Sequence, residues 1–227
     1  GKRASDAMAD NCPVKVAVVT GGHFFDVPNF HRLFRAVPGT DVYIQHMEDF
    51  ASSPAEVRDA YDVVLFYIML TGDPTDEGLP WYAGKPGEAI ERLGETGQSI
   101  FVLHHAILAY PDWPIWYEIS GVRKGEFGYR IGDSLRIQVA DGEHPITSGL
   151  SDWEMTDEMY EMNSPGEDSH VLLTTDHPRS MKTIAWTRRF KGSRVFCLQS
   201  GHDNDTWVDA NFCELLRRGI LWCAGTI

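Results

Sequence analysis

The chain has 227 residues, of which 43% are hydrophobic and 23% are charged, so it can fold as one large globular domain without disulfides. Acidic residues outnumber Lys and Arg by 33 to 20, which gives a formal net charge of −13. A field of that sign repels phosphate groups and therefore disfavours nucleic acid and anionic membranes as partners. It does not repel a neutral sugar or a metal cation.

The N-terminal segment 1–12 is expected to be flexible, and residues 13–227 are expected to form one domain. The start of the chain lacks the apolar core of a signal peptide, and no apolar stretch approaches the roughly 20 residues that span a bilayer. We therefore expect a cytoplasmic protein. The four cysteines have no CxxC spacing, so we expect reduced core thiols and no zinc ribbon or redox pair: Cys12, Cys197, Cys213 and Cys223.

Short apolar strands alternate with helices in the first half of the chain. Strands are predicted at 14–20, 41–45, 62–67 and 99–103. One helix is predicted through Phe30 and Val37, with Asp26 as a cap-type residue, and another through Ala89 and Leu93. This alternation predicts βαβ units around a mainly parallel sheet.

The middle stretch, 111–166, breaks this rhythm because it is rich in Trp, Pro, Gly and acidic residues. We interpret it as an insertion or lid over the carboxyl end of the sheet, and only 135–139 alternates clearly. Regular strands return at 171–174, 183–186 and 195–198. A final helix begins near Asp209 and ends at Gly225.

Several predicted strands end in chemically capable residues, and ligands of open α/β sheets bind at the carboxyl ends of strands. These ends are Gly21-Gly22-His23 with Asp26, His104-His105, and Gln199-Ser200-Gly201-His202-Asp203; Asp176-His177 lies in the loop before the strand at 183–186. Histidines that gather at one edge suit metal binding or acid–base chemistry. No HExxH or similar ligand motif accompanies them.

These motifs resemble the recurring blocks of the ThuA-like family, which is named for trehalose utilisation and belongs to the class I glutamine-amidotransferase-like superfamily. The blocks run in the family's order from about Val14 to Gly225. They are Val18-Val-Thr-Gly-Gly-His-Phe-Phe-Asp26, Phe101-Val-Leu-His-His105, Asp141-Gly-Glu-His-Pro-Ile-Thr147, Thr156-Asp-Glu-Met-Tyr160, Leu173-Thr-Thr-Asp-His-Pro178 and Gly201-His-Asp203.

The resemblance implies a flavodoxin-like three-layer α/β sandwich with a mainly parallel central sheet. It places 101–106 at the strand-to-helix elbow that carries the cysteine nucleophile of amidotransferases, so His104 or His105 replaces that thiol. His202 matches the triad histidine, with Asp203 or Asp205 near the acidic partner. Because no thiolate is available, glutamine amidotransferase chemistry is excluded. The segment 125–129 also lacks the histidine that many relatives carry after a small Gly-rich motif.

Each residue at the strand ends also has a structural interpretation. Gly22 suits a tight turn as well as close approach of a ligand, and Asp26 suits a helix cap better than substrate contact. The position of His23 at a strand end favours a functional role for this residue. The elbow is expected to expose His105, whereas His104 either faces the cleft or points inward as a hydrogen-bonded core histidine.

The remaining site residues come from the middle and end of the chain. Trp113 and Trp116 either stack on a sugar ring or, more in keeping with a Pro-rich segment, pack in the protein. Glu158, two residues before Tyr160, suits a general acid or a metal ligand. His202 followed by Asp203 favours a functional role.

We therefore expect an enzyme of sugar utilisation, acting on trehalose, a keto-sugar or a glycoside, with a non-catalytic carbohydrate-binding or assembly subunit as the alternative. The catalytic residues would be His105, Glu158 and His202. Substrate would contact Gly22, His23, Asp26, His104, Trp113, Trp116, Tyr160 and Asp203. A divalent metal such as zinc would bind His23, His105 and His202. No nucleotide cofactor is expected. The sequence does not determine the oligomeric state, and a homo-oligomer is one possibility.

Overall fold

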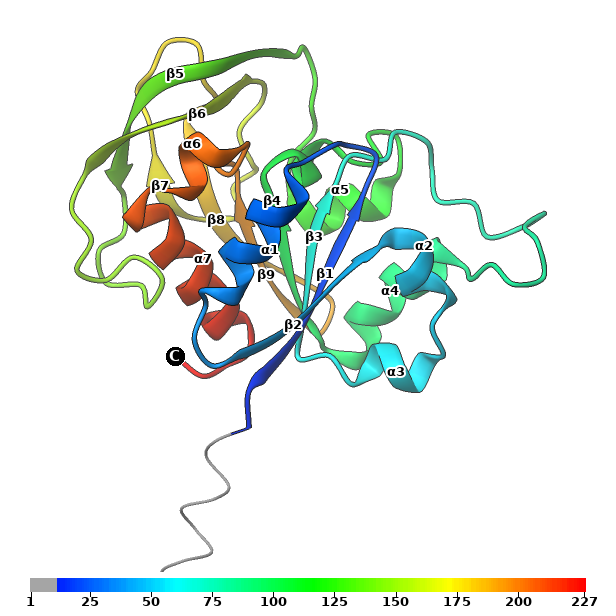
Figure 1. The fold of residues 1–227 in the computed structure, drawn as a ribbon. Helices are drawn as coiled ribbons and strands as arrows, with labels where there is room; N and C mark the ends of the chain where they lie inside the picture. Colours follow the sequence, from blue (N-terminus) through cyan, green and yellow to red (C-terminus); the bar gives the residue numbers. More distant parts are fainter. Residues whose placement is uncertain (1–11) are drawn as a thin grey trace, which may run out of the picture.

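Nine strands form one sheet in the order β2-β1-β3-β4-β9-β8-β7-β5-β6, with helices on both faces (Figure 1). The computed structural model describes residues 12–227. The strands are β1 (Val14–Gly21), β2 (Thr40–His46), β3 (Val63–Ile68), β4 (Ser99–Leu103), β5 (Gly128–Val139), β6 (Trp153–Glu161), β7 (His170–Thr174), β8 (Thr183–Phe190) and β9 (Ser193–Leu198). The helices are α1 (Val27–Arg35), α2 (Met47–Ser52), α3 (Ala55–Asp59), α4 (Pro86–Thr96), α5 (Pro114–Ser120), α6 (Asn204–Trp207) and α7 (Ala210–Cys223), with one 3-10 helix, η1 (His104–Leu108).

Strands β2, β1, β3, β4 and β9 are mutually parallel. Every residue of β3 and β4 is buried, as expected for parallel strands that helices cover on both faces. The apolar runs of the sequence predict this half of the sheet correctly, and all five strands point their carboxyl ends to the same edge.

The other half of the sheet is antiparallel. Strand β8 pairs antiparallel with β9 and β7, and β5 pairs antiparallel with β7 and β6. The prediction of a mainly parallel central sheet is therefore not confirmed, because parallel and antiparallel pairings are equally numerous. Hairpin connections need no crossover helix, which is why the helical rhythm stops in this part of the sequence.

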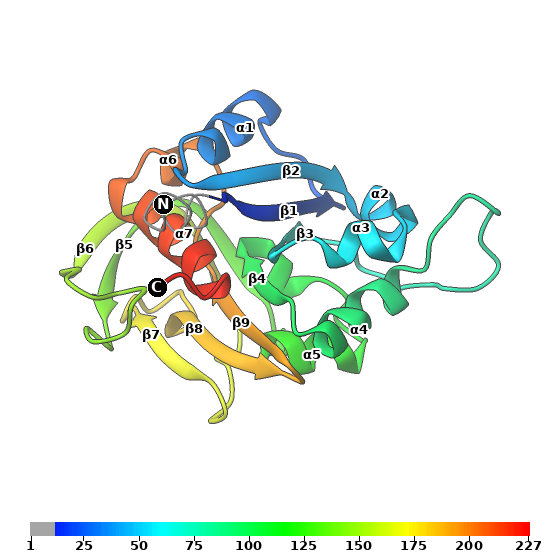
Figure 2. The ribbon, with the colours of Figure 1, turned by 90° about the horizontal axis from the view of Figure 1, so that it is seen from below.

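Two apolar cores lie on the two faces of the sheet. Phe30 of α1, Trp207 of α6 and Leu216 of α7 belong to one core. Phe50 of α2 and Ile90 of α4 belong to the other. Figure 2, from below, shows α1, α6 and α7 apart from α2, α3, α4 and α5. The described part of the chain is thus an α/β fold with helices on either side of a large mixed sheet.

The segment 111–166 forms α5, the long strand β5 and the edge strand β6. Its interpretation as a lid stays a prediction, as do the domain boundaries, and residues 1–11 of the segment predicted to be flexible lie outside the described part. Among residues 12–227, no helix combines the length and apolar character that crossing a bilayer requires. All four cysteines are free; Cys197 and Cys223 are buried as predicted, whereas Cys12 is exposed and is not a core residue.

Candidate functional site

The turn from β4 into η1 places two histidines beneath the carboxyl edge of the sheet. His104 has a φ of 53°, the left-handed region that non-glycine residues rarely adopt and that strained functional turns use. His104 is 0% exposed and His105 is 1% exposed. The expectation that this elbow exposes His105 is therefore wrong, since both side chains are covered.

His104 is held by hydrogen bonds on both ring nitrogens. Its Nδ1 lies at hydrogen-bond distance from the Gln199 carbonyl oxygen, and because a carbonyl only accepts, Nδ1 carries the proton. Its Nε2 lies 3.1 Å from Glu158 Oε1 and 2.9 Å from the Tyr160 hydroxyl. In the neutral ring, the Nε2 lone pair would then face a carboxylate oxygen, which is repulsive in a buried site unless a proton or a cation lies between them.

Strand β6 delivers Glu158 and Tyr160 to His104 because residues two apart in a strand share a face. Burial and the Glu158 carboxylate raise the pKa of Tyr160, so its hydroxyl keeps its proton and can donate. Burial alone would raise the pKa of Glu158, but hydrogen bonds and charge from His104 and His202 outweigh it and lower that pKa. Glu158 is therefore a carboxylate at neutral pH.

The neighbouring Asp157 points to the other face of β6 and fixes the turn that carries His202. Its carboxylate accepts from the backbone N–H groups of Gly201 at 3.0 Å and His202 at 3.1 Å. It also accepts from the N–H of Glu158 at 2.8 Å. Burial raises the pKa of Asp157. The bonds from Gly201 and His202 tie the turn after β9 to β6, whereas the bond from Glu158 lies within β6.

His202 completes the group around Glu158. Its Nδ1 lies 3.4 Å from Glu158 Oε1, and its Nε2 lies 4.0 Å from Asp203 Oδ2. Burial lowers the pKa of His202, but the Glu158 and Asp203 carboxylates outweigh this effect and raise it. The Nδ1 atom is buried and has no hydrogen-bond partner among residues 12–227. Asp203 meanwhile accepts from the N–H of Asp205 and caps α6.

The ligand atoms of His104, Glu158 and His202 all lie within 4.8 Å of one another, and within residues 12–227 this is the group of three or more His, Cys, Asp or Glu side chains that could hold a metal ion. The set predicted from sequence, His23, His105 and His202, shares only His202 with it. Two imidazoles and a carboxylate suit zinc and leave a coordination position open. Below, these three residues are called the Glu158 cluster.

His23 and His105 lie directly beside the Glu158 cluster. The His105 ring centroid is 4.5 Å from that of His23 and 4.2 Å from that of Tyr67, and the His23 centroid is 6.2 Å from that of His202. The three histidines that the sequence assigns to one cleft are therefore close together. Sequence motifs 80 to 180 residues apart meet here because the strands that carry them end at one edge.

His105 is a buried histidine whose imidazole ring is neutral. Its Nδ1 donates to the Ile68 carbonyl oxygen at 2.8 Å, and its buried Nε2 has no hydrogen-bond partner in the part of the chain that the structure describes. Burial, reinforced by the neighbouring His104 and His23 rings, lowers the pKa of His105 to about 2. Its Nε2 lone pair is therefore unprotonated at neutral pH and is free to accept a hydrogen bond.

The predicted contacts at the end of β1 have structural explanations. Gly22 has a φ of 77°, and a Cβ there would lie 2.6 Å from the Met69 carbonyl carbon, so the turn itself requires glycine. The Asp26 side chain accepts from the N–H of Asn29 and caps α1, which confirms the cap interpretation. It also accepts from the Asn204 side chain at 3.0 Å and so joins the β1 turn to α6.

The two tryptophans pack in the protein. Trp116 is 2% exposed, and its indole N–H donates to the Ala106 carbonyl oxygen. Trp113 is half-buried against the same core with its ring beside that of Tyr110. The packing alternative therefore describes both residues, and Trp116 has no face available for a sugar ring.

Three residues of the site are not among the catalytic, substrate-binding or metal-binding residues predicted from the sequence, although Gln199 belongs to one of the strand ends noted there. Gln199 fixes His104 through its carbonyl oxygen, and its side-chain amide donates to the Glu158 carbonyl oxygen at 2.9 Å. The Tyr67 hydroxyl donates to the carbonyl oxygens of Gly201 and His202. Asp157 is the third. The sequence signal for Asp157 is its position between Met155 and Met159, where an acidic residue interrupts an apolar alternation.

Comparisons with known proteins agree with this architecture. A ThuA-like protein from Parabacteroides merdae is 19% identical, with a TM-score of 0.74 over 93% of this chain and 90% of that one. A second from Bacteroides uniformis is 19% identical, with a TM-score of 0.71 over 93% and 92%. PurLQS from Thermotoga maritima is 13% identical, with a TM-score of 0.57 over 92% and 98%. At these identities, the likeness shows a shared fold of glutamine-amidotransferase-like type.

No curated protein sequence matches the chain. The sequence profile of the ThuA family, described as trehalose utilisation, matches residues 29–223, and this range includes β2 to α7 and the Glu158 cluster. The chain belongs to the ThuA family.

Proposed function

We propose that this protein is an enzyme of sugar utilisation that performs acid–base chemistry, assisted by a divalent cation such as zinc, at the Glu158 cluster. The observation that carries the proposal is the contact between His104 Nε2 and Glu158 Oε1 at 3.1 Å. With Nδ1 committed to Gln199, this pair needs a shared proton or a shared cation. The Tyr160 hydroxyl can satisfy Nε2 as a neutral donor, but the carboxylate beside the same nitrogen supports a further capacity to share a proton or a cation.

The residues present fit a divalent cation. His202 Nδ1 is buried beside Glu158 and has no hydrogen-bond partner within the described residues, as expected of a nitrogen that can take a ligand. A cation bound by His104, Glu158 and His202 would polarise a carbonyl group or a water molecule. The fixed Nδ1–H of His104 matches the usual orientation of a ligating histidine.

The surrounding side chains would handle the substrate. The Tyr160 hydroxyl keeps its proton and lies 2.9 Å from His104 Nε2, so it can donate a hydrogen bond to a reacting oxygen. His23, only half-buried, presents a ring at the open side, and the neutral, buried ring of His105 packs against it. Burial excludes bulk water from the reacting group, which strengthens each of these interactions.

Zinc titration of the chelator-treated protein, followed by calorimetry, tests the proposal. Wild type should bind one zinc ion, and Glu158→Gln should weaken that binding by about 100-fold or more, since a ligand and its charge are lost. The matched control is Glu161→Gln on the same strand, which removes only a surface pair with Arg179 and should leave zinc affinity unchanged.

A pH titration of the histidine ring signals accompanies the calorimetry. His105 should stay neutral down to about pH 4, given a pKa near 2. If wild type binds no zinc, and His105 and His202 titrate as ordinary histidines near pH 6.5, the enzyme proposal fails. The non-catalytic carbohydrate-binding alternative would then be the better account.

A further inference from the structure

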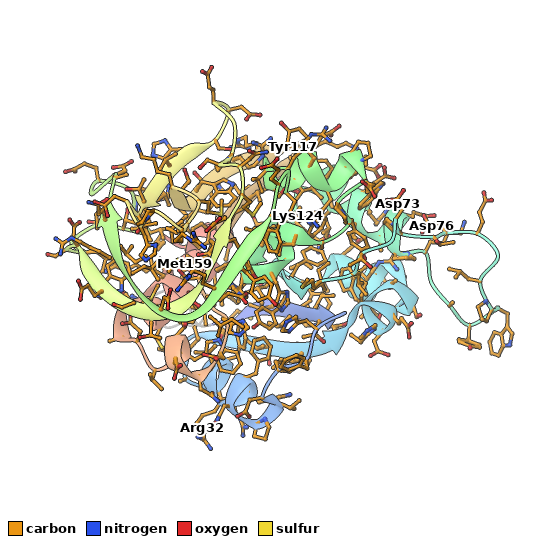
Figure 3. The ribbon with its side chains drawn as sticks, turned by 90° about the horizontal axis from the view of Figure 1, so that it is seen from above. Arg32, Asp73, Asp76, Tyr117, Lys124 and Met159 are labelled. Carbon is orange, nitrogen blue, oxygen red and sulfur yellow. The ribbon has the colours of Figure 1, made fainter. Side chains whose placement is uncertain are left out.

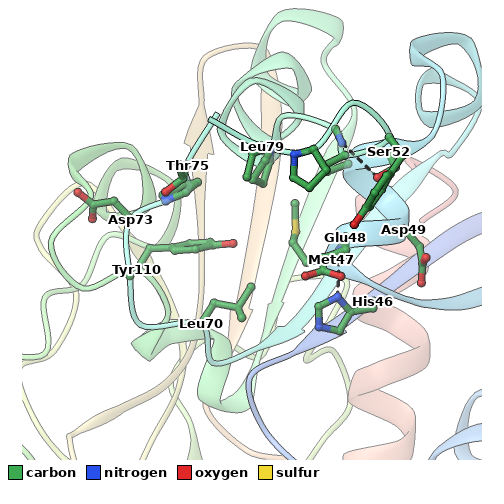
Figure 4. Close-up of a pocket in the computed structure, with 18 of the residues that line it drawn as sticks. His46, Met47, Glu48, Asp49, Ser52, Leu70, Asp73, Thr75, Leu79 and Tyr110 are labelled. Carbon is green, nitrogen blue, oxygen red and sulfur yellow. Dashed lines mark hydrogen bonds between the residues drawn. The ribbon is translucent and has the colours of Figure 1, made fainter. Parts of the chain in front are cut away.

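A cavity lies at the carboxyl edge of the sheet, and none of its lining residues belongs to the Glu158 cluster. Its volume is about 640 Å³, within the range of roughly 300–1,000 Å³ typical of small-molecule pockets. The cavity is enclosed by α2, by the loop 69–85 and by Tyr110 (Figure 4). We call it the loop pocket.

Backbone connections place the loop pocket next to the histidines. Leu70, in its wall, follows Ile68 by two residues, and the Ile68 carbonyl accepts from His105. Leu70 in turn accepts at its carbonyl from the N–H of Tyr110. On the β1 side, a Cβ at Gly21 would lie 2.8 Å from Nε2 of His46, another wall residue. The loop pocket is therefore connected, through the ends of β1 and β3, to the segments that carry His23 and hold His105.

Hydrogen bonds anchor the loop that forms the wall of the loop pocket at two places, to α2 and to the start of α4. Gly84 donates its N–H to Ser52 Oγ at 3.2 Å, and a Cβ at Gly84 would lie 1.8 Å from the Ala51 carbonyl oxygen. Only glycine permits this close approach to α2. The Asp76 carboxylate accepts from the N–H groups of Gly87 and Glu88 at the start of α4. The pocket is thus preformed, although the loop projects from the body of the protein (Figure 3).

The chemistry of the wall is apolar with an acidic rim. Tyr110, Leu70, Leu79 and Met47 surround the cavity in Figure 4, and Tyr82 adds a second aromatic ring. The charged residues of the wall are carboxylates, with no Lys or Arg among its described residues: Glu48, Asp49 and Asp73. Aromatic and aliphatic surfaces suit the C–H face of a sugar ring, and carboxylates accept hydrogen bonds from its hydroxyls. The same carboxylates repel a phosphate or carboxylate on a ligand.

We propose that the loop pocket binds an uncharged sugar ring, the part of a glycoside that does not react, and discriminates against phosphorylated sugars. This inference rests on the proposed function, because it names the class of substrate that the proposed enzyme would bind at this edge of the sheet. Binding energy from a ring held here would position a second ring at the Glu158 cluster.

Calorimetric binding of trehalose and of trehalose 6-phosphate tests the proposal, with two adjacent loop residues as a matched pair. Tyr82 lines the pocket, whereas Trp81 is 95% exposed and does not. Tyr82→Ala should weaken trehalose binding by about ten-fold or more, the usual effect of losing an aromatic contact, and Trp81→Ala should not. Wild type should bind trehalose 6-phosphate at least about ten-fold more weakly than trehalose. The double variant Asp49→Asn, Asp73→Asn should reduce this difference in affinity between the two sugars.

Each outcome separates this inference from the proposed function. Glu158→Gln should keep trehalose affinity while it loses zinc, and Tyr82→Ala should keep zinc affinity while it loses trehalose. A Tyr82→Ala variant that melts like wild type and binds trehalose as Trp81→Ala does would overturn the loop pocket alone. So would equal affinity for the two sugars, or no binding of trehalose, maltose or sucrose by wild type.

Discussion

The parallel strands β1, β4 and β9 bring histidines to the site on the turns that follow them, whereas the antiparallel strand β6 contributes from within the strand itself. His23, His104 and His202 each sit just past a strand end, where a mobile or strained backbone is tolerated. Glu158 and Tyr160 instead lie in a paired strand and are aimed by its alternation. The site therefore lies where the two halves of the sheet meet, and its carboxylate comes entirely from the antiparallel half.

Because the site draws on both halves of the sheet, its geometry depends on the contacts that hold β6 against the end of β9. Asp157 links β6 to the turn after β9 through the backbone N–H groups of Gly201 and His202. Gln199 links the same two strands through its side-chain amide and the Glu158 carbonyl oxygen. The ladder between β8 and β9 already joins the two halves of the sheet, and these side-chain bonds add a second connection at the site itself.

The largest effect is expected from Asp157→Ala, which breaks this second connection. Three backbone donors would lose their acceptor in a largely buried place, which should cost about 3 to 5 kcal/mol of unfolding free energy. Urea unfolding of the variant measures the loss. Asp133→Ala, which removes an acidic residue of the exposed Arg130 pair on β5, is the control and should change stability little. An equal, small change for both variants would mean that the β8–β9 ladder and other contacts hold the site together without Asp157.

A smaller effect is expected from His105→Ala, which tests the parallel half. The side chain is buried against Tyr67 and donates to Ile68, so truncation should cost about 2 to 3 kcal/mol through a cavity and an unpaired carbonyl. The exposed histidine expected from the elbow would have cost about 1 kcal/mol or less. Thermal and urea unfolding decide between the two values, and a change below 1 kcal/mol would argue that the ring is exposed in solution.

The parallel half could be predicted from the sequence because both faces of its strands are buried. The apolar runs of β1, β3, β4 and β9 are unmistakable, and the rule that ligands gather at their carboxyl ends correctly brings His23, His105 and His202 together. The final helix was also predicted, and Asp209 is its N-cap as expected.

Strand β6 could not be predicted for a physical reason. Its core-facing positions are Trp153, Met155, Asp157 and Met159, and the buried charge interrupts the apolar alternation that identifies a strand. The opposite face carries Glu158, whose polarity serves the site and not the fold. The same two carboxylates that hide the strand in the sequence create the site in the structure, as expected where function overrides local rules.

The choice between His104 and His105 was also beyond the sequence. Only the backbone shows that His104 takes the left-handed conformation of the elbow, and only the packing shows that Tyr67 and His23 cover the next ring. Adjacent histidines have the same chemistry, so the distinction depends on partners that come from other strands.

The smallest expected effect is the pH dependence of the contact between His202 and Glu158, measured on chelator-treated protein. The pKa of His202 is raised in the folded state, so its charge stabilises the fold fully below the ordinary value of 6.5. That contribution is lost as the pH rises through the raised folded value, while Glu158 stays ionised because its own pKa is lowered. The stability difference between wild type and His202→Gln should therefore shrink between pH 6 and pH 9, by about 1 kcal/mol or less. In the Glu158→Gln background, the change with pH should largely vanish, because the carboxylate that raises the pKa is gone. A difference that is flat with pH in both backgrounds would show that the two halves meet at this point through packing and not through charge.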